Sequence, residues 1–135
     1  MAADIISGTE IAAQIREELK VEVAELKKNG ITPGLVMVRV GEDPASVSYV
    51  SGKAKASDEL GIYSETIVLL QDTKEEVLLT KVEGLNKDPK FSGILVQLPL
   101  PKHIDGDKVL NAIDPRKDVD GFHPVNVGKL LIGEP

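Results

Sequence analysis

The chain has no cysteine and no tryptophan, and only 3% of its residues are aromatic. The absence of cysteine excludes disulfides, thiolate metal ligands and cysteine nucleophiles. Proteins that stack the bases of single-stranded nucleic acid need several exposed rings, so the scarcity of aromatic residues disfavours that function. No apolar run reaches the roughly 18 residues of a membrane span, and the charged N-terminal region does not resemble a signal peptide. The sequence therefore indicates a soluble, cytoplasmic protein without a membrane or nucleic-acid partner.

Size and charge narrow the class further. The chain has 135 residues, of which 41% are hydrophobic. That is enough for one globular core and too little for two full ones, so we expect a single domain over residues 1–135. The net charge is -6 with both signs interspersed, which is not the pattern of a polybasic surface for nucleic acid or membranes.

The order of predicted elements indicates an α/β fold. Apolar residues at helical spacing predict helices over 7–29, 44–61, 74–86, 105–112 and 126–132, and β-branched runs predict strands over 34–41, 62–70 and 91–97. Alternating helices and strands predict a three-layer α/β/α domain with a mostly parallel, twisted sheet. In such folds, ligands bind beyond the carboxyl ends of the strands.

The segment from Pro44 to Gly61 holds an unusual row of side chains. Ser46, Tyr49 and Lys53 recur at spacings of three and four, which places them on one face of a helix. A solvated helix face would explain the same pattern, because lysine and tyrosine often keep their polar ends in water. Tyr-x-x-x-Lys also occurs in short-chain dehydrogenases, but those enzymes need a glycine-rich turn after the first strand, and this chain lacks one.

Three motifs together resemble one enzyme family. They read Pro44-Ala-Ser-x-x-Tyr-Val-x-x-Lys-x-Lys-Ala56, Gly93-Ile-Leu-Val-Gln-Leu-Pro-Leu-Pro101 and Lys117-Asp-Val-Asp-Gly-Phe-His-Pro-x-Asn-Val-Gly128. In this order, the motifs resemble the catalytic domain of the bifunctional methylenetetrahydrofolate dehydrogenase/cyclohydrolases, the FolD type. Such enzymes of one-carbon metabolism, which supplies purine biosynthesis, are oxidoreductases that oxidise methylene-tetrahydrofolate to methenyl-tetrahydrofolate with NADP or NAD. They are also hydrolases that convert the methenyl compound to formyl-tetrahydrofolate.

The resemblance implies specific roles for residues of the three motifs. Lys53 corresponds to the catalytic lysine, with Tyr49 near the pterin ring and Gln97 hydrogen-bonded to the lysine. A lysine acts as a base only after it has lost its proton, and burial or a neighbouring donor or cation favours the neutral amine.

Substrate binding is implied for Ser46, Tyr49, Asp120 and Gly121. A carboxylate such as that of Asp120 can accept two parallel N–H bonds from an amino-pyrimidine edge. Asp118 and Asp120 are a poor candidate for a metal site, because two aspartates without further ligand spacing rarely hold a cation. We also expect Phe122 to pack beneath this loop.

The family's second half has no counterpart in this sequence. No Gly-x-Gly-x-x-Gly follows a strand, so the resemblance implies that NADP or NAD binds mainly to a domain absent from this chain. The expectation is a shortened form of an enzyme that is a homodimer when intact, with this chain monomeric. The alternative is a non-catalytic folate-binding or interaction module that remains after loss of the second domain.

Four other residues carry weaker expectations. Gly52 interrupts the central helix, and we expect it to allow close helix packing rather than to make room for a substrate. His103 and His123 lie in loops beside prolines and are expected to be solvated or hydrogen-bonded rather than catalytic. Lys55, two positions after Lys53, points elsewhere on the helix.

Overall fold

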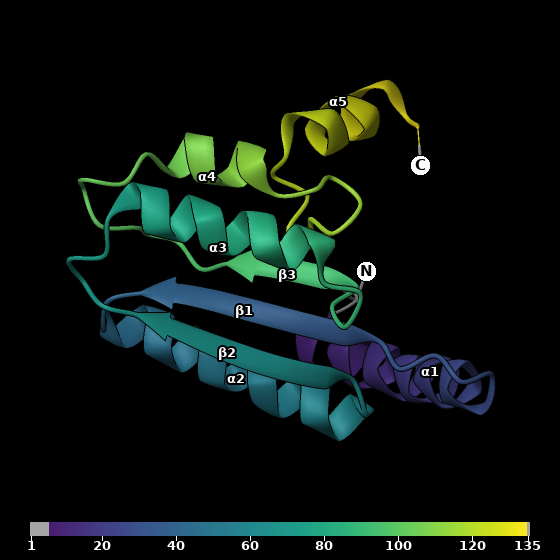
Figure 1. The fold of residues 1–135 in the computed structure, drawn as a ribbon. Helices are drawn as coiled ribbons and strands as arrows, with labels where there is room; N and C mark the ends of the chain where they lie inside the picture. The colour runs from purple at the N-terminus through teal and green to yellow at the C-terminus, as the bar shows by residue number, and fades with distance from the viewer. Residues whose placement is uncertain (1–5, 135) are drawn as a thin grey trace, which may run out of the picture.

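The computed structural model of the chain describes residues 6–134. Helices and strands alternate through most of this range, as the sequence predicts (Figure 1). The elements are α1 (Gly8–Lys28), β1 (Gly34–Val40), α2 (Pro44–Leu60), β2 (Tyr63–Leu69), α3 (Glu75–Lys87), β3 (Gly93–Val96), α4 (Gly106–Ala112) and α5 (Pro124–Ile132).

The three strands form one parallel sheet in the order β2-β1-β3. The central strand β1 pairs along its whole length with β2, from Gly34 opposite Tyr63 to Val40 opposite Leu69. It pairs with β3 from Leu35 opposite Gly93 to Val38 opposite Val96. This confirms the expected parallel sheet, and it brings the carboxyl ends of all three strands to one edge.

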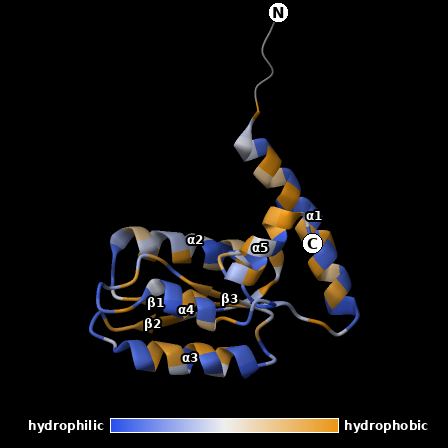
Figure 2. Cartoon of the chain, turned by 90° about the horizontal axis from the view of Figure 1, so that it is seen from above, coloured by the Kyte–Doolittle hydropathy of each residue, from blue (hydrophilic) through white to orange (hydrophobic). Residues whose placement is uncertain are grey.

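Helices cover both faces of the sheet, which confirms the three-layer arrangement (Figures 1 and 2). Successive residues of a strand point to opposite faces. Val36 and Val38 therefore join the core shared with α3 and α4, whereas Met37 packs with Val50 of α2 on the other face. Val36, Met37 and Val38 have no exposed surface, so β1 lies at the centre of the domain.

Helix α1 begins where the sequence predicts, with the Ser7 hydroxyl accepting a hydrogen bond from the backbone N–H of Glu10 (3.3 Å). Its C-terminal half lies beside α2, and its N-terminal half runs away from the sheet (Figure 2). Val23 is the one residue of this helix that is buried. Ile11 and Ile15, on the same apolar stripe, are about half exposed (47% and 48%).

Two elements begin two residues away from the predicted position, and the other boundaries agree to within one residue. Helix α5 begins at Pro124, two residues earlier than expected, because His123 caps it through a hydrogen bond that its Nδ1 accepts from the backbone N–H of Val125 (3.2 Å). Strand β3 is shorter than predicted, and Phe91 precedes it. Phe91 is nevertheless buried, and it packs into the core on the α3 side of the sheet.

None of the helices in residues 6–134 is both long and apolar enough to cross a membrane.

The start of β1 leaves no room for a side chain at Gly34. A Cβ there would stand 2.0 Å from the carbonyl oxygen of Lys90, which belongs to backbone. We expect Gly34→Ala to lower the free energy of unfolding by about 1–3 kcal/mol, because the strand and the Lys90 turn must move apart. Urea unfolding measures this change.

The matched control is Gly84→Ala in α3, where a Cβ would have no atom within 4 Å. That substitution is expected to stabilise the protein by about 0.5–1 kcal/mol, since alanine is the better helix former. Equal effects of the two substitutions would contradict the close approach at Gly34.

Candidate active site

Helix α2 begins at the carboxyl edge of the sheet, and local sequence fixes both of its ends. The Asp43 carboxylate accepts a hydrogen bond from the backbone N–H of Ser46 (2.8 Å), and Pro44 occupies the first turn. This hydrogen bond lowers the pKa of the Asp43 carboxyl. At the other end, Gly61 adopts a left-handed conformation (φ 76°) that suits glycine.

The three side chains of the predicted row on α2, Ser46, Tyr49 and Lys53, lie at different depths in the protein. Ser46 is 5% exposed, and its Oγ has no hydrogen-bond partner of good geometry in the described part of the chain. Tyr49, one turn later, is 65% exposed. Lys53 is half-buried. The three side chains therefore differ in depth, and Tyr49 and Lys53 are the two that reach solvent.

The structure brings Lys53 and Gln97 into contact. The Lys53 Nζ donates to the Gln97 Oε1 at 3.3 Å, across 44 positions of sequence. The backbone N–H of Gln97 donates to the carbonyl oxygen of Val38 (2.8 Å), which anchors Gln97 directly beyond the end of β3. The Gln97 Nε2 donates to the carbonyl oxygen of Leu98 (2.7 Å). Because the amide nitrogen is occupied in this way, the amide oxygen is the group that faces the lysine.

The loop before α5 is fixed at its base by Lys117. Its ammonium group donates to the carbonyl oxygens of Leu85 (3.1 Å) and Asp88 (2.7 Å) at the C-terminal end of α3, where a cation is favoured. The carbonyl oxygen of Lys117 accepts from the N–H of Ile94 in β3 (2.7 Å), next to a parallel bridge between Ile94 and Asp118. Nothing in the spacing of the third motif predicts this role for Lys117.

Asp118 organises the rest of the loop. Its carboxylate accepts hydrogen bonds from the backbone N–H groups of Gly121 (3.1 Å) and His123 (2.8 Å) and from Nδ2 of Asn126 (2.9 Å). Burial favours the neutral form, but these donors, led by His123, outweigh burial and lower the pKa of the Asp118 carboxyl below its ordinary value. Asp118 is therefore an ionised structural acceptor.

Asp120 lies inside this turn and is exposed. Residues 6–134 donate no hydrogen bond to its carboxylate. Because the Ile94–Asp118 bridge is parallel, the chain leaves Asp118 in the direction of β3, toward the edge that holds Gln97. Gly121 follows with φ 69°, a conformation that glycine adopts without strain.

Close approach of this loop to the sheet depends on Gly93. A Cβ at Gly93 would stand 2.4 Å from Cγ1 of Val119, so the loop crosses β3 where a side chain is absent. The close packing of the loop against β3 therefore explains why the second motif begins with glycine.

Two expectations about neighbouring residues were wrong. Phe122 does not pack beneath the loop, because the Asp118 turn directs the chain outward and leaves this ring 53% exposed. Gly52 is not a close-packing position, since a Cβ there would meet no described atom within 4 Å; it lines a shallow groove beside Arg16 of α1.

The two histidines are hydrogen-bonded, as expected. His103 contacts the carbonyl oxygen of Thr73 through Nε2 (2.8 Å), and His123 caps α5. Within residues 6–134, no group of three or more carboxylate or histidine side chains is placed to hold a metal ion.

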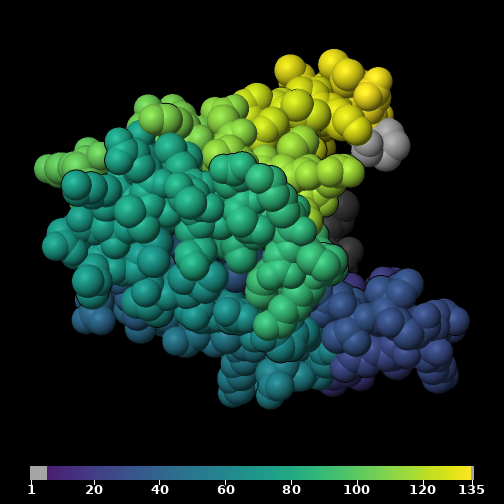
Figure 3. Space-filling view, viewed as in Figure 1, coloured from purple at the N-terminus to yellow at the C-terminus, as the bar shows by residue number. Residues whose placement is uncertain are grey.

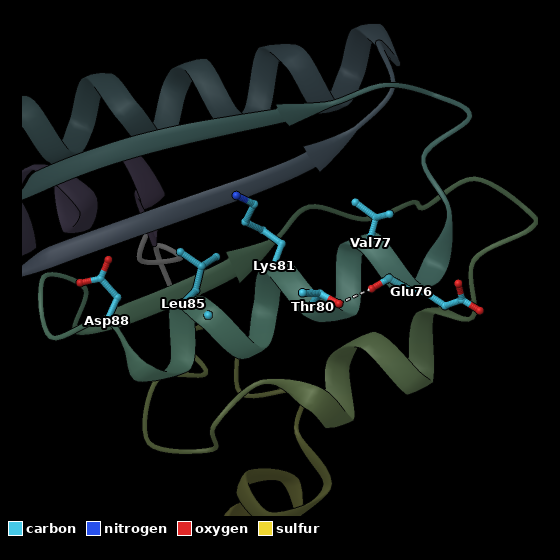
Figure 4. Close-up of a pocket in the computed structure, with 7 residues that line it drawn as sticks. Glu76, Val77, Thr80, Lys81, Leu85 and Asp88 are labelled. Atoms are coloured by element: carbon cyan, nitrogen blue, oxygen red, sulfur yellow. Dashed lines mark hydrogen bonds between the residues drawn. The ribbon is translucent and has the colours of Figure 1, made fainter.

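A groove of ≈ 540 Å³ lies on α3, away from the predicted site (Figure 4). Its lining comes from α3 and the residue after it, including Val77, Lys81 and Asp88. It contains none of the residues that the sequence selects.

The sequence matches a known family over most of its length. Residues 6–120 match the family described as tetrahydrofolate dehydrogenase/cyclohydrolase, catalytic domain. The chain belongs to this family.

Named relatives agree with this assignment. A protein from Acetivibrio thermocellus named bifunctional protein FolD is 58% identical over 135 residues, which are 100% of this chain and 47% of that protein. A protein of the same name from Dehalococcoides mccartyi strain 195 is 62% identical over 136 residues, covering 100% of this chain and 46% of that protein. The chain thus spans about half the length of the curated relatives it matches.

Solved structures of similar proteins have the same fold. The bifunctional FolD methylenetetrahydrofolate dehydrogenase/cyclohydrolase of Campylobacter jejuni superposes with a TM-score of 0.96 at 46% identity, over 98% of this chain and 47% of that one. The FolD enzyme of Trypanosoma brucei, complexed with NADP cofactor and an inhibitor, gives a TM-score of 0.91 at 39% identity, over 98% and 46%. The NAD-dependent enzyme of Saccharomyces cerevisiae gives 0.80 at 26% identity, over 90% of this chain and 38% of that one.

The turn that leads into the Lys117 loop yields a pH prediction. The guanidinium and the backbone N–H of Arg116 lower the pKa of the Asp114 carboxyl to about 2, from an ordinary 3.8. Because this pKa is lowered by folding, its contribution to stability is present above pH 3.8 and is lost as the pH falls through about 2. We expect Arg116→Gln to raise the Asp114 pKa toward 3.8, as measured by carboxyl-carbon NMR titration.

The Asp118 carboxyl, whose donors do not include Arg116, is the internal control and should titrate unchanged in this variant. An Asp114 pKa that stays at about 2 without the guanidinium would refute the assigned cause.

Proposed function

We propose that residues 1–135 form a folate-binding catalytic domain that carries the cyclohydrolase site of a bifunctional methylenetetrahydrofolate dehydrogenase/cyclohydrolase. The contact between Lys53 and Gln97 is the observation that carries this proposal. It joins a half-buried amine to an oriented amide at the carboxyl edge of a parallel sheet, where α/β folds bind ligands. Membership of the family supplies the substrate class.

The substrate's pterin ring would be held on the side of the site formed by the Asp118–His123 loop. Asp120 has an exposed carboxylate with unused acceptor positions, which suits the paired N–H groups of an amino-pyrimidine edge. Gly121 beside it allows a ring to approach the backbone. Tyr49 offers an exposed aromatic ring one turn from Lys53, and Ser46 lies deeper on the same helix.

In the hydrolysis, water adds to the electrophilic methenyl carbon and loses one proton. One carbon–nitrogen bond of the ring then breaks, the remaining hydroxyl proton passes to the departing nitrogen, and the product is formyl-tetrahydrofolate. Lys53 would accept the proton that the water loses, as the general base. Gln97 contributes by holding one N–H of the amine through Oε1, which leaves the nitrogen lone pair free to face the water. Gln97 is itself oriented by Leu98 and Val38, so this geometry exists before substrate binds.

The dinucleotide required for oxidation does not fit the strand ends of this chain. The turn between β1 and α2 reads Gly41-Glu-Asp-Pro44 and lacks the glycine-rich fingerprint. The N-terminus of α2, where a pyrophosphate would bind, is instead capped by the Asp43 carboxylate. NADP or NAD would therefore bind mainly to the half that the relatives have in addition, and no hydride transfer is assigned to residues 6–134.

The second half would also close the site and, in the intact enzyme, supply most of a homodimer contact. Valine and leucine side chains of α5 are exposed at the corner of the molecule, including Leu130 (81%) and Leu131 (85%) (Figure 3).

A cytoplasmic location fits a folate enzyme of one-carbon metabolism. The second candidate function is a non-catalytic folate-binding module, which the openness of the site to solvent favours.

The first test is hydrolysis of methenyl-tetrahydrofolate by this chain, compared with the rate in buffer. We expect the chain to accelerate hydrolysis and Lys53→Met to remove the acceleration, with a loss of about 10²–10⁴-fold, the usual range for a general base. Lys55→Met is the matched control, since this side chain is 80% exposed and pairs weakly with Glu59 at 4.0 Å. Its rate should equal that of the wild type.

If the wild type fails to accelerate hydrolysis, titration with tetrahydrofolate decides between the two candidates. Binding without catalysis would support the folate-binding module, and absence of binding would refute both functions for this chain.

The oligomeric state gives a separate prediction. If the dimer contact lies in the half that the relatives have in addition, this chain should sediment as a monomer of 14.5 kDa. A mass twice as large in analytical ultracentrifugation would place a dimer contact within these residues.

A further inference from the structure

Asp118 and Asp120 are only two positions apart, yet the structure gives their carboxylates opposite environments. Asp118 is half-buried, and its carboxylate accepts three hydrogen bonds from Gly121, His123 and Asn126. Asp120 is exposed and receives none from residues 6–134. The first carboxylate is used internally, whereas the second is available to a ligand.

The hydrogen bonds of Asp118 close a turn that contains Asp120, because they join Asp118 to backbone N–H groups that follow Asp120. Oδ1 of Asp118 accepts from Gly121, directly after Asp120, and Oδ2 accepts from His123, two positions further. The backbone of Asp118 is held against β3 beside Ile94. Asp120 is thus fixed between an anchored residue before it and two anchored N–H groups after it, although its own carboxylate forms no hydrogen bond with residues 6–134.

Asn126 connects this turn to α5. Its Nδ2 donates both to Oδ2 of Asp118 (2.9 Å) and to the carbonyl oxygen of Pro115 (2.8 Å). The first turn of α5, the loop and the segment before Lys117 are therefore tied together through one carboxylate and one amide. Removing the Asp118 carboxylate would release three donors at once.

We propose that Asp118 is a positioning residue for the folate site, one that holds the turn from which Asp120 reaches the substrate. This inference rests on the proposed function. It assigns to Asp118 no contact with the substrate and no part in the chemistry. A bidentate contact requires both carboxylate oxygens to meet the ring edge together, so a small rotation of the Asp120 backbone is enough to weaken it.

The test is a double-mutant cycle on tetrahydrofolate binding by this chain, with Asp118→Asn, Asp120→Asn and the double variant. Asp118→Asn keeps the shape of the side chain but replaces one acceptor oxygen by a donor. We expect it to raise the Kd of tetrahydrofolate by about tenfold or more, in the range found when a residue that orients a ligand-binding group is lost. In the Asp120→Asn background the same change should have little further effect, because the group that Asp118 positions is already lost.

Asp114→Asn is the matched control. The Asp114 carboxylate also accepts a backbone N–H from its own turn, that of Arg116, but this turn lies before Lys117 and does not enclose Asp120. It should leave the Kd unchanged. Amide hydrogen exchange gives an independent readout: Asp118→Asn should speed exchange at Gly121 and His123, which lose their acceptor.

The outcomes separate the two proposals. Failure of the wild type to bind tetrahydrofolate overturns the proposed function, and this inference with it. Binding by the wild type with an unchanged Kd in Asp118→Asn, or with fully additive effects in the cycle, overturns the positioning role alone. If Asp118→Asn does not fold, Asn126→Ala removes one of the three donors and replaces it in the same cycle.

Discussion

The backbone hydrogen bond from Gln97 to Val38 closes the pairing of β1 with β3, and the position of the site follows from it. Because strand side chains alternate, the register that places Leu95 on the α2 face places Gln97 there too. Lys53, from the middle of α2, then meets the Gln97 amide. A slip of one residue in this register would turn Gln97 to the α3 face and separate the pair. The chemistry proposed for Lys53 thus depends on how two central strands align.

A second constraint acts from the other side of the domain. Lys117 binds the last carbonyl groups of α3, and its own carbonyl oxygen pairs with Ile94. The chain is therefore attached to both the helix layer and the sheet directly before the Asp118–His123 loop. On this side of the site, the hydrogen bonds of Lys117 hold the base of the loop. Tyr49 and the apolar side chains of α5, in contrast, face solvent. One side of the site is therefore anchored by hydrogen bonds, and the other is open to solvent.

The sequence was sufficient for the elements and the layers, because the apolar spacing of α2 and α3 and the β-branched runs of β1 and β3 report burial directly. It also selected Lys53 and Gln97, which the structure joins. It was insufficient to predict how deeply each of these side chains is buried. Spacings of three and four put Ser46 and Lys53 on one helix face, but they do not say that the end of the helix near Ser46 is pressed into the protein while Lys53 reaches the edge. Packing between layers decides that.

Loop residues were the hardest to interpret from sequence. Phe122 is expected to pack beneath the loop, yet the direction of the chain after the Asp118 turn is set by three hydrogen bonds that no periodicity reports. Gly52 was assigned to packing because glycine is costly within a helix, but α1 diverges from α2 and leaves that position open. The signal that was available, and missed, was the Asp-x-x-Gly spacing from Asp118 to Gly121, typical of a side chain that caps its own turn.

Three aspartates lie in the turns around the site, and their hydrogen bonds distinguish their uses. The carboxylate of Asp43 is occupied by the first turn of α2, and that of Asp118 by the loop it folds. Both have lowered pKa values because backbone N–H groups stabilise the charge. Asp120 differs from both, because its carboxylate is exposed and receives no hydrogen bond from residues 6–134. A ligand that offers paired N–H donors therefore meets both oxygens of Asp120 without a competing donor from residues 6–134, in a turn that the Asp118 carboxylate holds in place.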